Sequence, residues 1–195
     1  MNKKYNALQT RRTPFSGMLF AILMLFGISQ TAFAQVTTNS GSGLAPTYAS
    51  LNLAITALNA TTITAPVIIT LTANEIAPVG GYSITAQGTA TNTIIIQGFV
   101  SAGTITASPA LVVGVVTDAI FKLIGADFVT IQNFTMQENA VNTISATAAS
   151  NNMTEWGVAL LYASTTNGAQ NNTIQNNTIS LNRAYSNTLD RKSVV

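Results

Sequence analysis

Short runs of β-branched and other apolar residues, separated by turn residues, fill the chain beyond Pro66. The runs are Val67–Ala73, Ser83–Ala86, Asn92–Phe99, Leu111–Val116 and Ile120–Gly125. Such runs, broken by Gly, Pro, Asn or Ser, predict β-strands rather than successive helices. Strand spacing alone also permits an antiparallel sandwich or barrel.

One earlier segment has a helical period instead. Tyr48, Leu51, Ile55 and Leu58 recur at spacings of three and four residues, which places them on one helix face. We expect an amphipathic helix over 47–60, with Thr47 as its N-cap. The residues before it, 35–46, are rich in Thr, Ser, Gly and Asn and predict a flexible leader.

The first 34 residues have the three-part pattern of a secretory signal. A basic head is followed by an apolar run, Met18–Ile28, and by the small-residue sequence Ala32-Phe33-Ala34. The apolar run is about half the length that a membrane-spanning helix needs. We therefore predict a signal peptide over 1–34, cleaved after Ala34, and a bacterial protein exported by general secretion with no membrane span after cleavage.

Two segments repeat without a gap. Phe128–Asn139 reads FVTIQNFTMQEN and Asn171–Asn182 reads NNTIQNNTISLN, an offset of 43 residues. Upstream, FKLIGAD from Phe121 matches VALLYAS from Val158, and IIIQGF from Ile94 resembles the same core phrase. Repetition at such a period indicates stacked structural units.

These phrases resemble the right-handed parallel β-helix proteins of pectate-lyase type over roughly Thr61–Asn182. The resemblance implies an all-β fold: a right-handed single-stranded parallel β-helix over 61–182 with an N-terminal amphipathic capping helix. It also implies that Ile131 and Ile174 point inward and that Gln132 and Gln175 point outward.

By the same resemblance, Asn133 and Asn176 form an internal ladder at a turn, where Asn tolerates a left-handed backbone. Asn139 and Asn182 repeat that arrangement at the next turn. Glu138 departs from the pattern, because it stands where the other copy has Leu181. Its carboxylate is expected to end the strand early or to turn toward solvent.

Composition removes several classes of function. The chain contains no Cys and no His, which excludes disulfides, the common zinc sites and Ser-His-Asp triads. Loss of the signal removes four of the eight basic residues and none of the six acidic ones, leaving a net charge of −2. No basic stripe then remains for nucleic acid.

Candidate chemistry is sparse. Asp118, Lys122 and Asp127 form the one dense charged trio, interpreted either as a substrate-binding cluster or, preferably, as turn chemistry. Glu155 beside Trp156 pairs a carboxylate with an aromatic that could stack on a sugar, although such a Trp more often fills a core edge. We assign no catalytic, cofactor-binding or metal-ligating residue.

The tail, 183–195, matches no coil phrase and is expected to be uncapped or non-native, so we expect an N-terminal fragment. The leading hypothesis is an exported module of a secreted or cell-surface, adhesin-like protein that binds carbohydrate or another surface protein. The alternative is the N-terminal part of a polysaccharide lyase or glycoside hydrolase. This chain is expected to be non-enzymatic under the first hypothesis.

Overall fold

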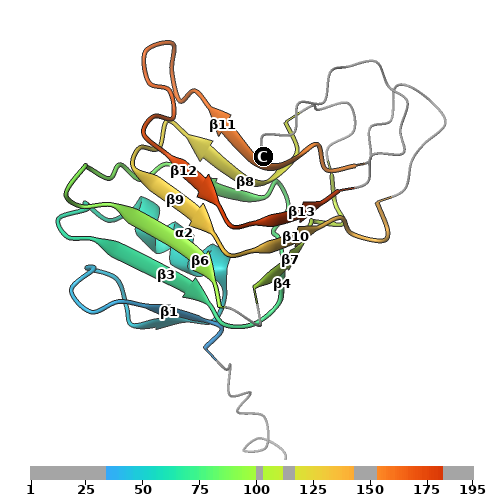
Figure 1. Ribbon diagram of the computed structural model, residues 1–195, viewed down its shortest axis with the longest axis horizontal. Helices are drawn as coiled ribbons and strands as arrows, with labels where there is room; N and C mark the ends of the chain where they lie inside the picture. The colour runs from blue at the N-terminus through green and yellow to red at the C-terminus, as the bar shows by residue number, and fades with distance from the viewer. Residues whose placement is uncertain (1–33, 100–102, 112–116, 143–152, 182–195) are drawn as a thin grey trace, which may run out of the picture. The chain divides into compact units, whose positions relative to one another are not determined.

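The computed structural model describes residues 34–99, 103–111, 117–142 and 153–181. These residues form mostly β-structure with one short helix, and their strands fall into three sheets, here named A, B and C (Figure 1). The all-β prediction is therefore confirmed. The predicted strand Leu111–Val116 lies almost wholly outside the described residues.

Sheet A contains β1 (Val36–Thr38), β2 (Thr47–Tyr48), β3 (Val67–Leu71), β6 (Ile94–Gly98), β9 (Val129–Gln132) and β12 (Thr173–Gln175). Sheet B contains β4 (Glu75–Ile76), β7 (Thr104–Thr106), β10 (Thr135–Gln137) and β13 (Thr178–Ser180). Sheet C contains β5 (Tyr82–Ile84), β8 (Ala119–Ile124) and β11 (Trp156–Leu161).

From β3 onward the chain visits the sheets in a fixed order. Each visit to sheet A is followed by one to B and then one to C, and the next strand returns to A. Strands from successive rounds are neighbours within each sheet, and all their pairings are parallel. A parallel return needs a long connection, which here runs through the other two sheets.

The offset between the repeated phrases of the sequence is also the offset at which the strands of these sheets pair. Ile174 pairs with Ile131 in sheet A, and Thr178 pairs with Thr135 in sheet B, both at the predicted offset. The resembling phrase of β6 also fits, because Ile96 pairs with Ile131. Ile96 and Ile131 are fully buried, while Ile174 is partly buried against the same core. The inward positions were therefore predicted correctly.

The segment before the helix is not a flexible leader. Val36–Thr38 form β1, which lies antiparallel between β3 and β2. Thr47 and Tyr48, expected in the helix, form β2 instead, so Thr47 is not the N-cap. Pairing with β1 at the edge of sheet A gives the backbone groups of these two residues their partners in an extended conformation.

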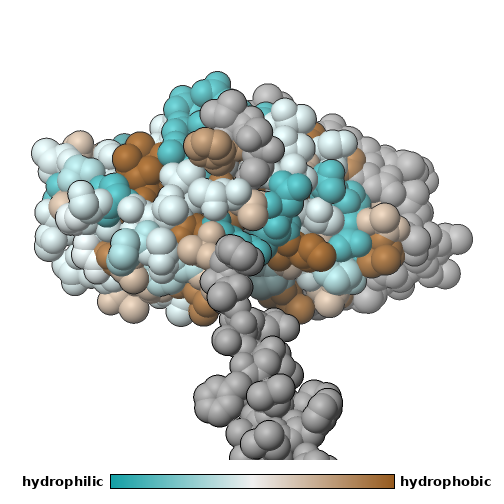
Figure 2. All heavy atoms as spheres, turned by 90° about the horizontal axis from the view of Figure 1, so that it is seen from below, coloured by the Kyte–Doolittle hydropathy of each residue, from teal (hydrophilic) through white to brown (hydrophobic). Residues whose placement is uncertain are grey.

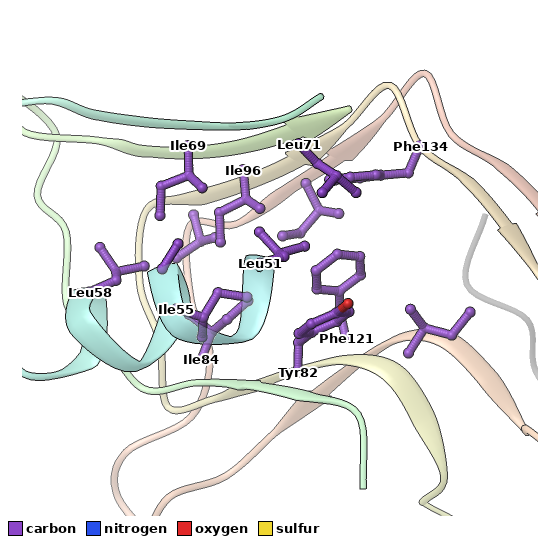
Figure 3. Close-up of a cluster of buried hydrophobic side chains, with 14 of the residues drawn as sticks. Leu51, Ile55, Leu58, Ile69, Leu71, Tyr82, Ile84, Ile96, Phe121 and Phe134 are labelled. Carbon is purple, nitrogen blue, oxygen red and sulfur yellow. The ribbon is translucent and has the colours of Figure 1, made fainter. Parts of the chain in front are cut away.

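The helix, α2 (Leu51–Asn59), begins after Ser50, whose side-chain oxygen accepts a hydrogen bond from the Leu53 amide at 3.2 Å. Figure 3 shows Leu51, Ile55 and Leu58 facing the side chains of sheets A and C. All three are buried, as the helical spacing predicts. The first helical amide, Leu51 N, donates to Glu75 Oε2 at 2.9 Å.

Three aromatic side chains form one end of the core. Tyr82 and Phe121 are partners in sheet C, with ring centroids 5.2 Å apart, and Phe121 lies 5.2 Å from Phe134. All three rings are buried (Figure 3). The Tyr82 hydroxyl donates to Glu75 Oε1 at 2.9 Å, so the only polar atom of this aromatic row has a partner.

Asparagines at the turns occupy two different roles. Asn133 and Asn176 have φ of 60° and 55°, which confirms the left-handed conformation, but both are exposed, so the internal ladder predicted for them is wrong. The half-buried neighbour Asn177 bonds inward, accepting from Phe134 N at 3.0 Å and donating to Ile131 O at 2.9 Å. Asn139 donates inward to Ala107 O at 3.0 Å, and Asn182 lies outside the described residues.

Neither expectation for Glu138 holds, because β10 ends at Gln137 just as β13 ends at its partner Ser180, and the carboxylate does not turn away into solvent. Its Oε1 accepts from Asn142 Nδ2 at 2.7 Å and from Thr154 Oγ1 at 2.9 Å, and its Oε2 accepts from Thr154 N at 3.1 Å. The carboxylate thereby joins the residues that follow β10 to those that precede β11.

Within the described ranges no helix has the length and apolar character required to cross a membrane. Apolar residues on the face seen in Figure 2 are scattered among hydrophilic ones. The exposed large apolar side chains include Leu53, Ile76 and Val79. Isolated exposed residues of this kind are ordinary on folded proteins.

Candidate ligand groove

Strands β8 and β11 of sheet C are followed by connections of different length. The two strands pair in parallel up to Ile124 and Leu161, and the next paired positions, in sheet A, are Thr130 and Thr173. Five residues lie between Ile124 and Thr130, whereas eleven lie between Leu161 and Thr173. The later round therefore carries six additional residues.

The insertion is Tyr162–Asn167. Removing it aligns Gly168-Ala169-Gln170 with Gly125-Ala126-Asp127, and the backbone agrees: Gln170 N donates to Asp127 Oδ1 at 2.7 Å, and Gln170 O accepts from Phe128 N at 3.2 Å. The match of FKLIGAD to VALLYAS is thus right for its first four residues and wrong for its last three.

The inserted residues form a tight turn that projects beyond the end of β11 (Figure 1). Ala163 N donates to Asn167 O at 2.8 Å, and Asn167 N donates to Ser164 O at 3.2 Å. These bonds satisfy the turn backbone internally. The residues of the turn, including its hydroxyl and aromatic residues, are exposed.

A groove of about 290 Å³ lies beside this turn. Tyr162 lies at the groove with three quarters of its surface exposed, and Leu160 beside it is 42% exposed. The lining combines aromatic, aliphatic, hydroxyl and amide groups and contains no charged side chain: Leu160, Leu161, Tyr162, Thr165, Thr166, Gly168, Ala169 and Gln170. Its volume is close to the lower end for small-molecule sites.

Gly168 determines how the Tyr162 ring lies. A Cβ at position 168 would stand 2.9 Å from a ring carbon of Tyr162, closer than van der Waals contact allows. The ring therefore lies directly against the Gly168 backbone. A side chain at this position would push the ring away and change the shape of the groove.

The charged trio expected from the sequence does not assemble into one site. Asp118 precedes β8 and is 4% exposed, and Lys122 lies four residues further along this extended strand, about 13 Å away. Asp127 lies beyond the other end of β8, where it accepts the Gln170 amide. The geometry supports the structural interpretation of these residues.

Glu155 and Trp156 lie at the start of β11. Glu155 Oε2 accepts from Asp118 N at 3.0 Å, and Trp156 N donates to Asp118 O at 3.1 Å, so the two rounds of sheet C are joined there. Trp156 is half-buried and pairs with Ala119. This placement is that of a core-edge Trp, whereas Tyr162 and Phe99 are exposed aromatic residues.

Four described carboxylates, those of Glu75, Asp127, Glu138 and Glu155, each accept at least one backbone amide. Glu75 binds the start of α2, and Asp127 binds Gln170. Glu138 accepts the amide of Thr154, just before β11, and Glu155 accepts the amide of Asp118, just before β8. Asp190 lies outside the described residues. No group of three or more potential metal-ligating side chains occurs within the described ranges.

The sequence contained a signal for the groove that the repeat comparison missed. The phrases that begin at Phe121 and Val158 are 37 residues apart, whereas the next phrases are 43 apart. Such a difference places an insertion between them, and insertions in repeat folds map to loops that often bind. No family model, curated protein or solved structure matches this chain.

Proposed function

We propose that residues 61–182 form a right-handed parallel β-helix whose N-terminal end is covered by α2. The repeated order of sheets A, B and C and the parallel pairing of successive rounds support this fold. Parallel strands joined by a crossover are right-handed in almost all proteins, because of the strand twist. The position of α2 beside β5 supports a capping role, since Asn59 bonds the Ser83 and Thr85 backbone there.

On this scaffold, we propose an exported cell-surface or secreted module that binds neutral carbohydrate. The observation that carries this proposal is the uncharged groove beside the inserted turn, with the exposed ring of Tyr162. The signal-like first 34 residues supply the export.

The chemistry of the groove fits a sugar ring. The face of Tyr162 and the exposed Leu160 offer apolar area to sugar C–H groups, while Thr165, Thr166 and Gln170 offer hydroxyl and amide partners to sugar hydroxyls. An acidic glycan would need cations, and the lining contains none. Neutral glycans are therefore the expected ligands.

A binding panel tests the proposal. The mature chain is incubated with insoluble β-1,4-glucan, mannan and starch and with pectin and alginate as acidic comparators, and bound protein is measured. We expect retention on at least one neutral glycan and about tenfold weaker binding by Tyr162→Ala, which corresponds to about 1.4 kcal/mol. Retention of both proteins on acidic glycans alone would contradict it.

The same samples distinguish the alternative, an N-terminal part of a polysaccharide lyase or glycoside hydrolase. Released reducing ends or unsaturated products are measured after incubation. Their reproducible appearance with the purified chain would favour the enzyme and contradict a purely binding module.

A further inference from the structure

The last described round of sheet A has an open backbone edge beside the groove. Among the described strands, β12 stands at the end of the sheet and pairs with β9 alone. Ala169, which lines the groove, and Asn172, which precedes β12, are half-buried. Within the described ranges, Ala169 O accepts no hydrogen bond and Asn172 N donates none. Half-buried backbone groups usually have partners, so these two groups, here named the open backbone pair, are suited to a ligand.

The preceding round shows what kind of partner fits such a pair. The equivalent groups there, 43 residues earlier, are Ala126 O and Val129 N. Both bind one carboxamide, because Asn172 Nδ2 donates to Ala126 O at 2.7 Å and Asn172 Oδ1 accepts from Val129 N at 2.9 Å. The pair therefore holds two neighbouring polar atoms, of which one donates and the other accepts.

The same arrangement recurs elsewhere in the fold. Asn177 donates to Ile131 O and accepts from Phe134 N, again through one carboxamide. Asn39 and Asn59 each bind a backbone carbonyl and a backbone amide in the same way. Recognition of an adjacent donor and acceptor by the backbone is thus a repeated feature of this chain.

A vicinal diol of a sugar ring offers the same combination. Its two hydroxyls lie side by side on adjacent ring carbons, and each can donate or accept. One hydroxyl can therefore donate to Ala169 O while its neighbour accepts from Asn172 N, as the two ends of a carboxamide do one round earlier. The diol is uncharged, and so is every side chain that lines the groove.

We propose that the open backbone pair binds a vicinal diol, which makes the groove selective for 1,4-linked neutral glycans. This inference rests on the proposed function and names the linkage of its ligand. In a 1,4-linked hexopyranose chain, every internal residue keeps free hydroxyls on the adjacent carbons C2 and C3. In a 1,3-linked chain, the internal residues keep hydroxyls on C2, C4 and C6, and no two of these carbons are adjacent. The exposed ring of Tyr162, in the same groove, remains available to the face of the sugar.

Two glucans with the same monomer and different linkages test this inference. The mature chain is incubated with insoluble β-1,4-glucan and with insoluble linear β-1,3-glucan, and bound protein is measured over a range of protein concentrations. We expect about tenfold tighter binding to the β-1,4-glucan, because the internal residues of the other polymer leave the open backbone pair without a partner.

NMR then locates the contact. The Asn172 amide resonance should shift on titration with soluble β-1,4-glucan oligosaccharides. The Asn177 amide is the internal control, because it is the equivalent edge group at the next turn and lies outside the groove lining. Equal or tighter binding of β-1,3-glucan, or an unmoved Asn172 amide, would overturn the linkage selectivity alone. Retention on neither glucan would overturn it too, and the absence of mannan and starch binding as well would overturn the proposed function.

Discussion

At the scale of single residues, asparagine side chains take the place of a missing strand neighbour. Asn39 accepts from Ile68 N at 2.7 Å and donates to Pro66 O at 2.9 Å, and Asn59 bonds β5 in the same way. Asn172 and Asn177 bond the backbone of the preceding round. One amide carries both a donor and an acceptor, which is what an unpaired backbone segment needs.

Substituting Asn177 with Ala should therefore destabilise the fold by about 1 to 3 kcal/mol, because Phe134 N and Ile131 O lose their partner. Asn176→Gly is the matched control, since Asn176 is exposed and left-handed and glycine adopts that conformation readily. Urea midpoints measure both. A larger loss for Asn176→Gly would contradict the assignment of the two residues.

Sequence patterns predicted that an Asn at these turns adopts a left-handed backbone, but not which amide points inward. In Asn176-Asn177 both residues have the same side chain, so composition carries no information about direction. The left-handed residue turns its own side chain outward and the next one faces the core side. That direction depends on the backbone of the turn, which only the structure supplies.

Tyr82 gives the fold a specific sensitivity to alkali. Burial, together with the neighbouring Glu75 carboxylate, raises the pKa of Tyr82 well above its ordinary value. The unfolded chain loses the Tyr82 proton at a lower pH than the folded chain does. The contribution of Tyr82 to stability is therefore fully present below about pH 10 and is lost as the pH rises further.

At neutral pH, Tyr82→Phe should be less stable by about 0.5 to 1.5 kcal/mol, because the hydrogen bond to Glu75 is lost. Between about pH 9 and 11, its free energy of unfolding should fall less than that of the unsubstituted chain. Denaturant midpoints across this range measure the difference. Tyr162→Phe is the control, because Tyr162 is exposed and lies outside the core. Parallel curves for the chain and Tyr82→Phe would contradict the buried assignment.

At the scale of elements, strand pairing overrides local signals. Thr47 is an acceptable N-cap and Tyr48 fits the helical face, yet both pair with β1, and the helix starts three residues after Tyr48. The polar, Gly-rich composition of 35–46 predicts flexibility because it lacks an apolar period. The pairing of β1 with β3 depends on residues about 30 positions away, which no local pattern contains.

Deleting Tyr162–Asn167 should remove the groove and keep the fold. The deletion joins Leu161 to Gly168 and restores the length of the preceding round, in which Gly125 follows Ile124. We expect the free energy of unfolding to change by no more than about 0.5 kcal/mol, as for ordinary surface substitutions. We also expect that the variant is not retained on neutral glycans. Full retention by the deletion variant would place the binding surface elsewhere, and failure to fold would show that the turn is structural.

At the scale of the whole described unit, the repeat was the most informative part of the sequence. Phrases such as NNTIQNNTI predicted the parallel register of sheets A and B, because inward-facing apolar residues stack on inward-facing apolar residues, Ile174 on Ile131 and Ile179 on Met136. The groove was not predicted, since the inserted residues have no counterpart in the repeat and only the difference between the 37- and 43-residue offsets indicates them. Binding sites in repeat proteins are commonly found at such interruptions.

The most direct test of the account is to map where a sugar binds. The ¹⁵N-labelled mature chain is titrated with soluble β-1,4-glucan and β-1,4-mannan oligosaccharides, and amide chemical shifts are followed by NMR. We predict that the largest changes for at least one sugar occur at Tyr162, Thr165, Gly168 and Gln170, with Gly168→Ala reducing them. Changes confined to the outer faces of sheets A and B, or no change with either sugar, would contradict it.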